Sequence, residues 1–351
     1  MRVSTRHQRG LTIVELMVGL ALGLFLLGGV LHIYLSSNQT YRSTEALARM
    51  QENGRFAMDF LLPDIREAGY KGACSRDQPI KNHLNTTSAD KYFDVGAGIE
   101  GWEAGTGGNN LPDYLAGTDT ILLKHSAAWS GVTASGNTGP NTETINLSGG
   151  ASGIPAGTIM VISSEIGCEI FQKTNNANAN TITKASGGAA TPGNVTPGDN
   201  FIDGYSDTME ISFLQSAIYY ISQRAGALPM LRRVTFNAGT AVTAAAETEL
   251  VEGVIDMQIC YGVDTNEDIS VDSFVKANAV TNWDDVRAAR ITVVTVSPQE
   301  NVATEAVSVQ FPDCDGTVLT RTAADYPELG QRRLAQAFTS TIGLRNRLHH
   351  E

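Results

Sequence analysis

The sequence lacks the short motifs that identify most enzyme families. It contains no GxSxG, no HExxH and no phosphate-binding loop ending in Gly-Lys. Aromatic residues are scarce, at 7% of 351 residues, whereas glycine is abundant, with 35 residues. This composition suits a loop-rich β protein better than a helical bundle, and we expect no enzymatic activity.

Positive charge is also in short supply. The chain has 25 Lys and Arg against 37 Asp and Glu, which gives a formal net charge of -12. Proteins bind the phosphate backbone of nucleic acids mainly through Lys and Arg side chains. We therefore expect no nucleic-acid partner. The length is sufficient for one large or two small domains.

One long hydrophobic run lies near the start of the chain. Residues 11–35, LTIVELMVGLALGLFLLGGVLHIYL, exceed the roughly 20 apolar residues that a bilayer-spanning helix needs. Arg2, Arg6 and Arg9 precede the run, and an acidic chain follows it. Because positive charge accumulates on the cytoplasmic side of a span, we expect the N-terminus in the cytoplasm. An ordinary secretory signal would have a shorter apolar core and a small-residue cleavage site.

Only one full charge interrupts this run, at Glu15. A charged group inside a membrane helix costs about 2.5–3.5 kcal/mol on insertion scales, so it usually has a partner. If the chain were cut after Gly10, Leu11 would carry a new α-amine one helical turn from Glu15. The carboxylate could then neutralise the amine of a neighbouring copy in an assembly. Alternatively, Glu15 lies among the lipid headgroups and stays solvated, and spacing alone does not decide between these interpretations.

The stretch RGLTIVELMVGLALG resembles the class III signal of type IV pilins and type II secretion pseudopilins. That signal is a basic leader ending in Gly, followed by an apolar run with Glu at its fifth position. The resemblance implies that prepilin peptidase cuts after Gly10 and methylates Leu11, and that Glu15 is the assembly glutamate. The family most often begins its mature chain with Phe, whereas Leu11 stands here. Residues 1–10 would be the leader and residues 11–35 the transmembrane half of a longer helix.

Residues 36–70 have the pattern of an amphipathic helix, the second half of that element. Apolar residues recur at spacings of three and four, with Gly54 in the same stripe. The apolar members are Leu47, Met50, Ala57, Leu61, Ile65 and Ala68. The stripe predicts that the helix continues from the membrane and packs on a globular head. Pro63 removes a backbone donor and should kink or interrupt the helix, and Gly69 should end it.

Residues 71–351 form the predicted head, which lies outside the inner membrane, in the periplasm or at the cell surface. Its pattern is mostly that of antiparallel strands joined by long loops. Strands are expected at residues 92–95, 119–125, 158–163, 168–173, 208–214, 215–222, 231–236, 249–261, 287–297, 303–311 and 334–344. Loops rich in small polar residues are expected at 130–153 and 175–200. A long N-terminal helix packed on a mainly antiparallel β head is the α+β, type IV pilin-like fold.

Two further segments resemble PilW-like minor pilins and their pseudopilin J relatives. They are DIREAGY at residues 64–70 and RRLAQAFTSTIGLRNR at residues 332–347. The resemblance implies a subunit that is stored in the inner membrane and then placed at or near the pilus tip. There it would act with other minor pilins and the major pilin to prime filament assembly, which serves twitching motility and adhesion. The alternatives are a J-like pseudopilin of type II secretion and a membrane-anchored adhesin whose head binds a ligand.

The four cysteines are Cys74, Cys168, Cys260 and Cys314. They form no CxxC, and no histidine lies at metal-ligand spacing from them, which argues against zinc. An exported head lies in an oxidising compartment, so two disulfides are expected. Three connectivities are possible, and nearness along the chain favours Cys74–Cys168 and Cys260–Cys314. Buried free thiols are the alternative.

One acidic segment places oxygen-bearing side chains at alternate positions. They belong to Asp264, Asn266, Asp268, Ser270 and Asp272. Calcium takes six to eight oxygens, whereas this segment offers five side chains. The glycine and the bidentate glutamate of an EF-hand are here replaced by Ile and Val. A looser calcium loop and an acidic hairpin turn are the two interpretations, and calcium is the only cofactor that the sequence suggests.

Overall fold

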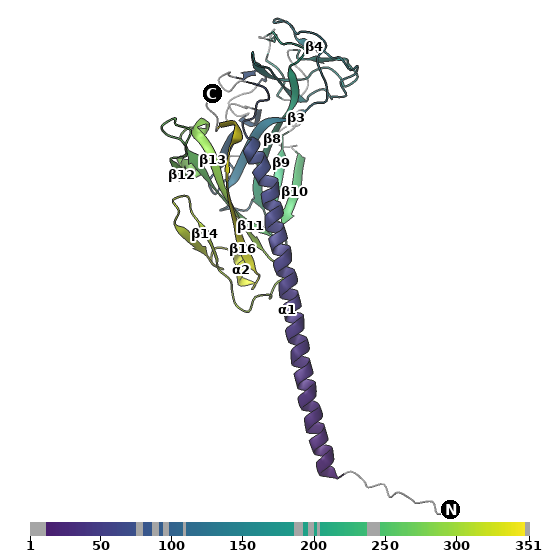
Figure 1. The fold of residues 1–351 in the computed structure, drawn as a ribbon, viewed down its shortest axis with the longest axis vertical. Coiled ribbons are helices and arrows are strands. Elements are labelled where there is room, and N and C mark those ends of the chain that lie inside the picture. The colour runs from purple at the N-terminus through teal and green to yellow at the C-terminus, as the bar shows by residue number, and fades with distance from the viewer. Residues whose placement is uncertain are drawn as a thin grey trace, which may run out of the picture.

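The computed structural model describes residues 12–74, 80–85, 91–93, 98–107, 110–185, 192–195, 200–201, 204–236 and 246–347. Its dominant element is the helix α1 (Ile13–Glu67), which is 55 residues long. Figure 1 shows the first part of α1 standing out from a β-rich head as a bare rod, while its second part lies against the strands. The predicted α+β, pilin-like fold is confirmed. The domain boundaries proposed from the sequence stay predictions.

The second half of α1 buries one stripe of side chains against the head. The buried positions are Ala46, Met50, Gly54, Ala57, Met58, Leu61 and Ile65. Leu47, which the sequence placed in this stripe, is 40% exposed, and Ala46 takes the inward position instead. The helix also runs through Pro63 to Glu67, so of the predicted kink or interruption at Pro63 the interruption does not occur. Leu61 and Ile65, on either side of the proline, are fully buried, and this packing holds the last turn in place.

The helix packs on a four-stranded antiparallel sheet. The order of its strands is β12 (Ser273–Val275), β11 (Val254–Val263), β13 (Val286–Val296) and β16 (Ala335–Gly343). α1 lies across β16 and β13. The strand β13 consists largely of β-branched residues and is buried along nearly its whole length, as expected of a central strand with both faces covered.

A larger sheet of eight strands forms the rest of the head. Its main path runs β1 (Lys81–Asn82), β6 (Cys168–Gln172), β5 (Ile159–Ser163), β8 (Glu210–Ser222), β3 (Thr120–Trp129) and β2 (Ile99–Trp102). β9 (Met230–Thr235) also pairs with β8, and β10 (Ala246–Glu252) pairs with β9. All of these pairings are antiparallel except the short parallel pairing of β1 with β6.

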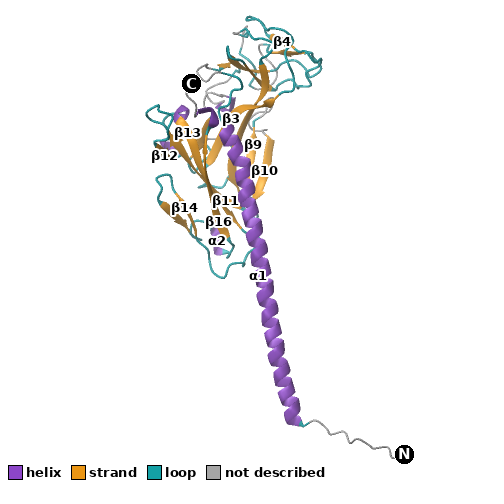
Figure 2. Cartoon of the chain, viewed as in Figure 1, coloured by secondary structure: helices purple, strands orange, loops and turns teal. Residues whose placement is uncertain are grey.

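The strand β8 joins two parts of the head. β3 pairs along one edge of β8, while β5 and then β9 pair along successive parts of the other edge. The first part of β8 therefore belongs to a lobe far from the start of α1, and its second part belongs to the body beside the helix (Figure 2). We call the described part of residues 130–209 the distal lobe. It contains the small pairing of β4 (Thr144–Asn146) with β7 (Thr181–Thr183).

Several strand predictions need correction. Residues 92–95 were expected to be a strand, but Lys91–Phe93 form a 3₁₀ helix, η1. The two strands expected at 208–214 and 215–222 are one continuous strand, β8. The segments 130–153 and 175–200 were expected to be loops, yet they supply β4 and β7.

The last part of the chain holds the remaining short elements. The strand predicted at 303–311 begins only at Val309, where β14 (Val309–Pro312) pairs with β15 (Val318–Arg321). They are followed by the short helix α2 (Pro327–Gly330) and, after β16, by the 3₁₀ helix η5 (Arg345–Arg347). Two further 3₁₀ helices, η3 (Ala277–Ala279) and η4 (Trp283–Asp285), precede β13.

Candidate functional site: the N-terminal helix and its surroundings

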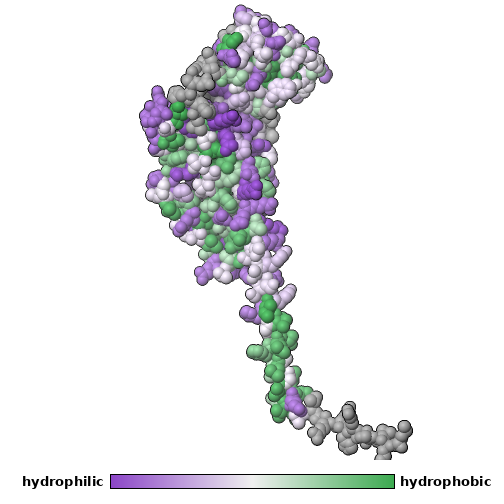
Figure 3. Space-filling model, in the orientation of Figure 1, coloured by the Kyte–Doolittle hydropathy of each residue, from purple (hydrophilic) through white to green (hydrophobic). Residues whose placement is uncertain are grey.

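The first part of α1 presents an apolar surface that nothing in the head covers. We call residues 13–35 the stem. Large side chains such as Phe25, Leu24 and Ile33 are mostly exposed along it. α1 is the one helix in the described part of the chain that is long and apolar enough to cross a membrane. Figure 3 shows the stem as a band of hydrophobic residues below a mixed head surface. An exposed apolar surface of this size marks a site of contact with lipid or with another protein surface.

Glu15 and Thr12 cap the start of the stem together. The backbone N–H and the hydroxyl of Thr12 both donate to Oε2 of Glu15, at 3.0 Å and 2.9 Å. In return, the backbone N–H of Glu15 donates to Oγ1 of Thr12 at 3.3 Å. This reciprocal arrangement is a capping box. No hydrogen bond from a described residue reaches Oε1 of Glu15, so that oxygen can accept from a neighbour. The predicted cleavage site, Gly10 and Leu11, lies outside the described residues.

Sequence reasoning overlooked Thr12, although its signal was present. A Thr followed three residues later by Glu, just before an apolar run, predicts a capped helix start. Here the two residues are Thr12 and Glu15, and the capped helix begins at Ile13. The cap gives Glu15 a role within its own chain besides the proposed pairing with a neighbour. It also satisfies backbone donors that would otherwise be costly in an apolar surrounding.

A close contact fixes the second half of α1 on the sheet at Gly54. The ring of Phe338 in β16 lies directly against the backbone of this glycine, where a Cβ atom would lie 2.5 Å from Cζ of the ring. Nearby, the side-chain amide of Asn53 donates to the carbonyl of Glu252 at 2.9 Å. The glycine thus lets helix and sheet approach more closely than a larger residue would allow.

The end of α1 is anchored by polar contacts with β8 and β3. Asp64 accepts hydrogen bonds from the Tyr219 hydroxyl and from Nε2 of Gln215, the latter at 3.2 Å. Nε2 of the buried His125 lies 3.9 Å from Oδ1 of Asp64. Burial and the nearby Asp64 carboxylate raise the pKa of Tyr219 well above its ordinary value, so this hydroxyl keeps its proton as the donor. The helix end is therefore rigidly positioned over the larger sheet.

Beyond this anchor, a cleft of about 810 Å³ opens between the end of α1 and the distal lobe. Trp129, at the end of β3, is 61% exposed at this cleft, and Tyr70 lines it as well. Glu210 contributes a carboxylate whose Oε2 accepts from the Ala73 backbone N–H at 3.0 Å. Burial, followed by the Glu210 charge, raises the pKa of Tyr70. Arg345 adds a cation. The cleft is thus amphipathic and lies at the end of α1 opposite the stem.

The four cysteines form two disulfides in the structure. Cys74 is bonded to Cys168, and Cys260 is bonded to Cys314. This is the connectivity that nearness along the chain favoured. The first bond ties the chain just after α1 to β6 at the lobe, and the second ties β11 to the turn between β14 and β15. Both links cross between segments that do not pair as strands.

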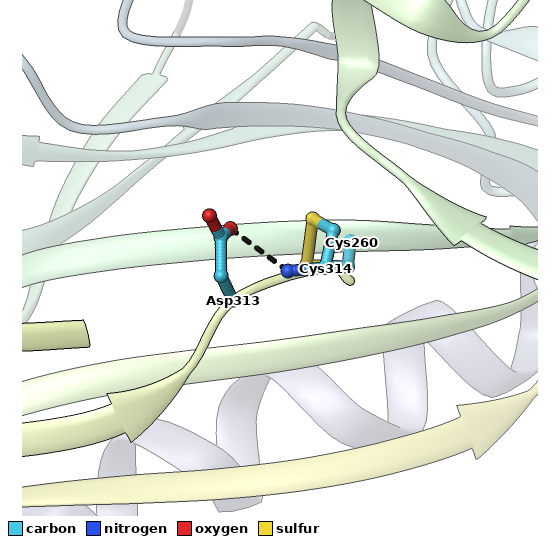
Figure 4. A group of neighbouring side chains, drawn as sticks. All are labelled: Cys260, Asp313 and Cys314. Carbon is cyan, nitrogen blue, oxygen red and sulfur yellow. Dashed lines mark hydrogen bonds between the residues drawn. A yellow bond between two sulfur atoms is a disulfide. The ribbon is translucent and has the colours of Figure 1, made fainter. Parts of the chain in front are cut away.

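A small group near the second disulfide has the composition of a metal site. Oδ1 of Asp313 and the sulfur atoms of Cys260 and Cys314 lie close together, as Figure 4 shows. The two sulfur atoms are bonded to each other, however, and a thiolate is the form of cysteine that binds a metal. Oδ1 of Asp313 accepts from the backbone N–H of Cys314 at 2.8 Å. In the oxidised protein this group is therefore a capped turn.

The acidic segment predicted as a calcium loop folds as a tight turn after β11. Its first residue, Asp264, is buried and accepts a hydrogen bond from Nε of Arg287 at 3.0 Å. The backbone N–H groups of Asp268 and Ile269 also donate to Asp264, at 3.2 Å and 2.9 Å. Burial raises the pKa of Asp264, but these hydrogen bonds and the Arg287 charge outweigh it, and the pKa lies below its ordinary value.

The other predicted calcium ligands mostly serve the same turn. Oδ2 of Asp272 accepts from the backbone N–H of Thr265 at 2.8 Å, and Oδ1 of Asp268 accepts from that of Ser270 at 2.8 Å. Nδ2 of Asn266 donates to Oδ2 of Asp268 at 3.2 Å. The five residues are thus brought together, but side-chain oxygens of four of them (Asp264, Asn266, Asp268 and Asp272) already accept from donors of the chain itself. The occupied oxygens favour the acidic hairpin turn over the calcium loop, which is a matter for a direct test with calcium.

Comparisons with known proteins agree with the helix-and-head architecture. The family model described as Type IV Pilus-assembly protein W (PilW) matches residues 218–346, from β8 to η5. The model of the Prokaryotic N-terminal methylation motif matches residues 5–31. No curated protein and no solved structure matched the chain. The two matched regions contain most of the stem and the whole four-stranded sheet, and the distal lobe lies between them in the sequence.

Proposed function

We propose that this chain, which is a PilW-like, type IV pilus-related pilin, is a minor pilin of the complex that initiates pilus assembly at or near the tip. The observation that carries the proposal is the exposed apolar stem, which is capped by Glu15 and joined without a break to the head through α1. A protein that is only anchored in the membrane needs a membrane-spanning segment, but that segment need not continue rigidly into the head. A filament subunit needs both, because the head must hold a fixed position relative to neighbouring stems.

The proposed pathway begins in the inner membrane, with the head on the periplasmic side. Prepilin peptidase would cut after Gly10 and methylate Leu11, which creates an α-amine next to the capped helix start. As the stem leaves the lipid and packs among other stems, both the amine and Glu15 enter an apolar surrounding. Unpaired charges there are costly, so the carboxylate of Glu15 neutralises a neighbour's amine through Oε1 while Oε2 keeps the Thr12 cap.

Three single variants test the role of Glu15. Glu15→Gln keeps an acceptor for the Thr12 N–H but removes the charge, Glu15→Ala removes both, and Thr12→Val removes the hydroxyl but keeps the charge. We expect all three to insert and to be cleaved. Both Glu15 variants should be absent from sheared filaments, whereas Thr12→Val should still enter them, since the loss of a cap costs only about 1 kcal/mol. Normal incorporation of Glu15→Ala would refute the pairing role.

The place of action is tested separately in a deletion strain. A minor pilin that initiates assembly should be required for normal pilus number and twitching motility. If deletion instead abolishes protein secretion and leaves pili intact, the chain is a J-like pseudopilin, in which the same stem chemistry would serve a secretion pseudopilus.

A second candidate function is ligand binding by the head, as in an adhesin. The specific observation in its favour is the cleft beside Trp129, because exposed Trp and Tyr in a concave polar site are typical of binding surfaces. Replacement of Trp129 by Ala should then abolish surface adhesion without altering the number of pili. Unchanged adhesion would exclude a role for this cleft.

A further inference from the structure

The cleft beside Trp129 lies at the end of the molecule that is farther from the stem. Three parts of the chain line it: the end of α1, the neighbouring ends of β3 and β8, and the 3₁₀ helix η5. The start of α1 lies at the opposite end of the molecule (Figure 1). The part of α1 between the stem and the cleft is roughly 45 Å long, at about 1.5 Å per residue. A chain held in the membrane by its stem therefore presents this cleft well outside the lipid.

An irregularity in β3 precedes the exposed tryptophan. The pairing of β3 with β8 is regular up to Ser126, which lies opposite Leu214, and then shifts register before Trp129 pairs with Ser212. A β-bulge of this kind bends a strand and redirects the side chains that follow it. Ser126 before the shift is buried, whereas Trp129 after it is 61% exposed. The indole is thus an apolar surface that the rest of the chain leaves mostly uncovered.

The polar side chains that line the cleft include both donors and acceptors of hydrogen bonds. Arg66 and Arg345 are donors, and neither forms a hydrogen bond or an ion pair with another described residue. Asp207 is an acceptor that is equally free within the described part of the chain. Glu210 is a second acceptor, since the Ala73 N–H binds only its Oε2 atom. These groups are therefore available to a ligand.

Tyr70 adds a second ring near the charges of the cleft. It is 38% exposed. Burial, followed by the Glu210 charge, raises the pKa of Tyr70, while the Arg345 charge lowers it. Both charges therefore act on the Tyr70 hydroxyl, although they come from different elements. The cleft thus combines aromatic rings with donors and acceptors in one place.

A saccharide is the ligand whose chemistry matches this combination. A pyranose ring has a face of C–H groups that can cover an indole, and each of its hydroxyls both donates and accepts hydrogen bonds. Such hydroxyls can bind a guanidinium and a carboxylate side by side. The three carboxylates that line the cleft, Glu67, Asp207 and Glu210, outnumber the two arginines. This slight excess of negative charge does not favour an acidic sugar, so the expected ligand is neutral.

An extended peptide fits the same cleft less well. Peptides that bind beside a sheet commonly add a strand to a free edge. One edge of β3 pairs with β8. On its other edge, the backbone N–H of Lys124 donates to the carbonyl of Gly98 at 2.8 Å, and that of Ser126 donates to the carbonyl of Tyr70 at 2.6 Å. The part of β3 that leads into the cleft therefore has both of its edges occupied.

We propose that this cleft binds a short neutral saccharide, with one pyranose ring stacked on Trp129. Arg66 and Arg345 donate to its hydroxyls, and Asp207 and Glu210 accept from them. The inference rests on the second candidate function, ligand binding by the head, and it adds the class of ligand and the residues that hold it. Trp129, Asp207 and Glu210 lie outside both regions that match family models. The proposed site therefore belongs to the part of the chain that the matches do not cover.

Saturation-transfer NMR on the purified full-length chain tests the proposal, because it detects weak ligands without an intrinsic reporter. The chain is kept in a detergent whose headgroup contains no sugar. The probes are neutral disaccharides and trisaccharides of glucose, galactose and N-acetylglucosamine, their counterparts with a uronic or sialic acid, and a short uncharged peptide. We expect saturable transfer to at least one neutral saccharide, strongest at the C–H groups of one ring face.

Substitutions in the cleft then locate the binding site. Trp129→Ala should weaken saccharide binding by at least about tenfold, because the stacked ring loses its partner, and Trp129→Phe should weaken it less, because an aromatic face remains. Arg345→Ala with Asp207→Ala should also weaken binding, since a donor and an acceptor are lost. Trp283→Phe is the matched control, because this tryptophan lies in η4 and does not line the cleft. An unchanged urea midpoint shows that each variant is folded.

The opposite outcomes overturn the proposal. They are no transfer to any neutral saccharide, stronger binding of the acidic saccharides or the peptide, and binding that the Trp129 and Arg345 variants leave unchanged. The candidate function fails separately. If the wild type binds a saccharide through Trp129 but cells with Trp129→Ala adhere normally, the adhesin function fails and the saccharide site stands. If those cells lose adhesion while no saccharide binds, the saccharide proposal alone fails.

Discussion

Gly54 offers a sharp test of how the helix is seated on the head. A Cβ atom at this position would lie 2.5 Å from Cζ of Phe338 and closer still to two other ring atoms. The ring cannot retreat freely, because β16 is held in register with β13, where Phe338 pairs with Val293. Gly54→Ala must therefore shift the ring or lift the helix from the sheet.

Two opposing effects set the size of the change. Overpacking of a contact of this kind costs about 1–3 kcal/mol. Ala is favoured over Gly inside a helix by about 1 kcal/mol, which offsets part of that cost. We expect Gly54→Ala to lower the free energy of unfolding by about 1 kcal/mol. In a Phe338→Ala background the clash is absent, so the same substitution should raise the free energy of unfolding by about 1 kcal/mol.

The test is whether the effect of Gly54→Ala on the free energy of unfolding changes sign between the wild-type and the Phe338→Ala backgrounds. Urea unfolding of the full-length chain in detergent micelles can be followed by tryptophan fluorescence, because the three tryptophans of the sequence all lie in the head. Gly23→Ala is the matched control, since nothing lies within 4 Å of a Cβ at that stem position. It should leave the head's unfolding midpoint unchanged. If Gly54→Ala has the same sign in both backgrounds, the Phe338 contact does not explain why a glycine is there.

Three further predictions concern the stability of the head. Replacing Cys260 and Cys314 together by Ala should lower the free energy of unfolding by about 4 kcal/mol, because the bond closes a loop with a sequence separation of 54; an unchanged urea midpoint would contradict this. Burial raises the pKa of Asp119 from 3.8 to about 7. The folded state therefore binds the Asp119 proton more tightly than the unfolded state does. Below about pH 4 this tighter binding contributes up to about 4 kcal/mol to the free energy of unfolding, and the contribution is lost as the pH rises to 7. The difference in unfolding free energy between wild type and Asp119→Asn should shift accordingly between pH 4 and pH 7, and a constant difference would count against the raised pKa. Finally, because Arg287 already occupies Asp264, millimolar calcium should not raise the melting temperature, whereas a rise with calcium but not with magnesium would support a calcium loop.

The stem could be predicted because its signals are local. An apolar run of sufficient length, a basic flank and one glutamate are all properties of adjacent residues. The capping box at Thr12 and Glu15 is equally local, because its two residues are only three positions apart. The strand β13 was also predicted well, since its β-branched residues favour a strand whatever its neighbours.

The distal lobe was predicted less well because its pairings join segments that are distant in the sequence. β4 and β7 are each three residues long, and Ile145 finds its partner in Ile182. Neither segment has enough apolar residues to indicate a strand by itself. The continuity of β8 was likewise hidden, because one part pairs with β5 and another with β9. A sequence pattern cannot tell a strand shared by two partners from two separate strands.

Phe56 and Phe60 show the limit of periodicity on a helix. In the sequence they lie among apolar residues and could belong to the buried face as well as Ala57 and Leu61 do. Each phenylalanine is one residue before a buried position, which is a rotation of about 100° around the helix axis. Only the placement of β10 decides whether that rotated face is covered, and here it is left open as a groove. The exposure of the two rings therefore results from the head's topology, which no periodicity in the helix sequence records.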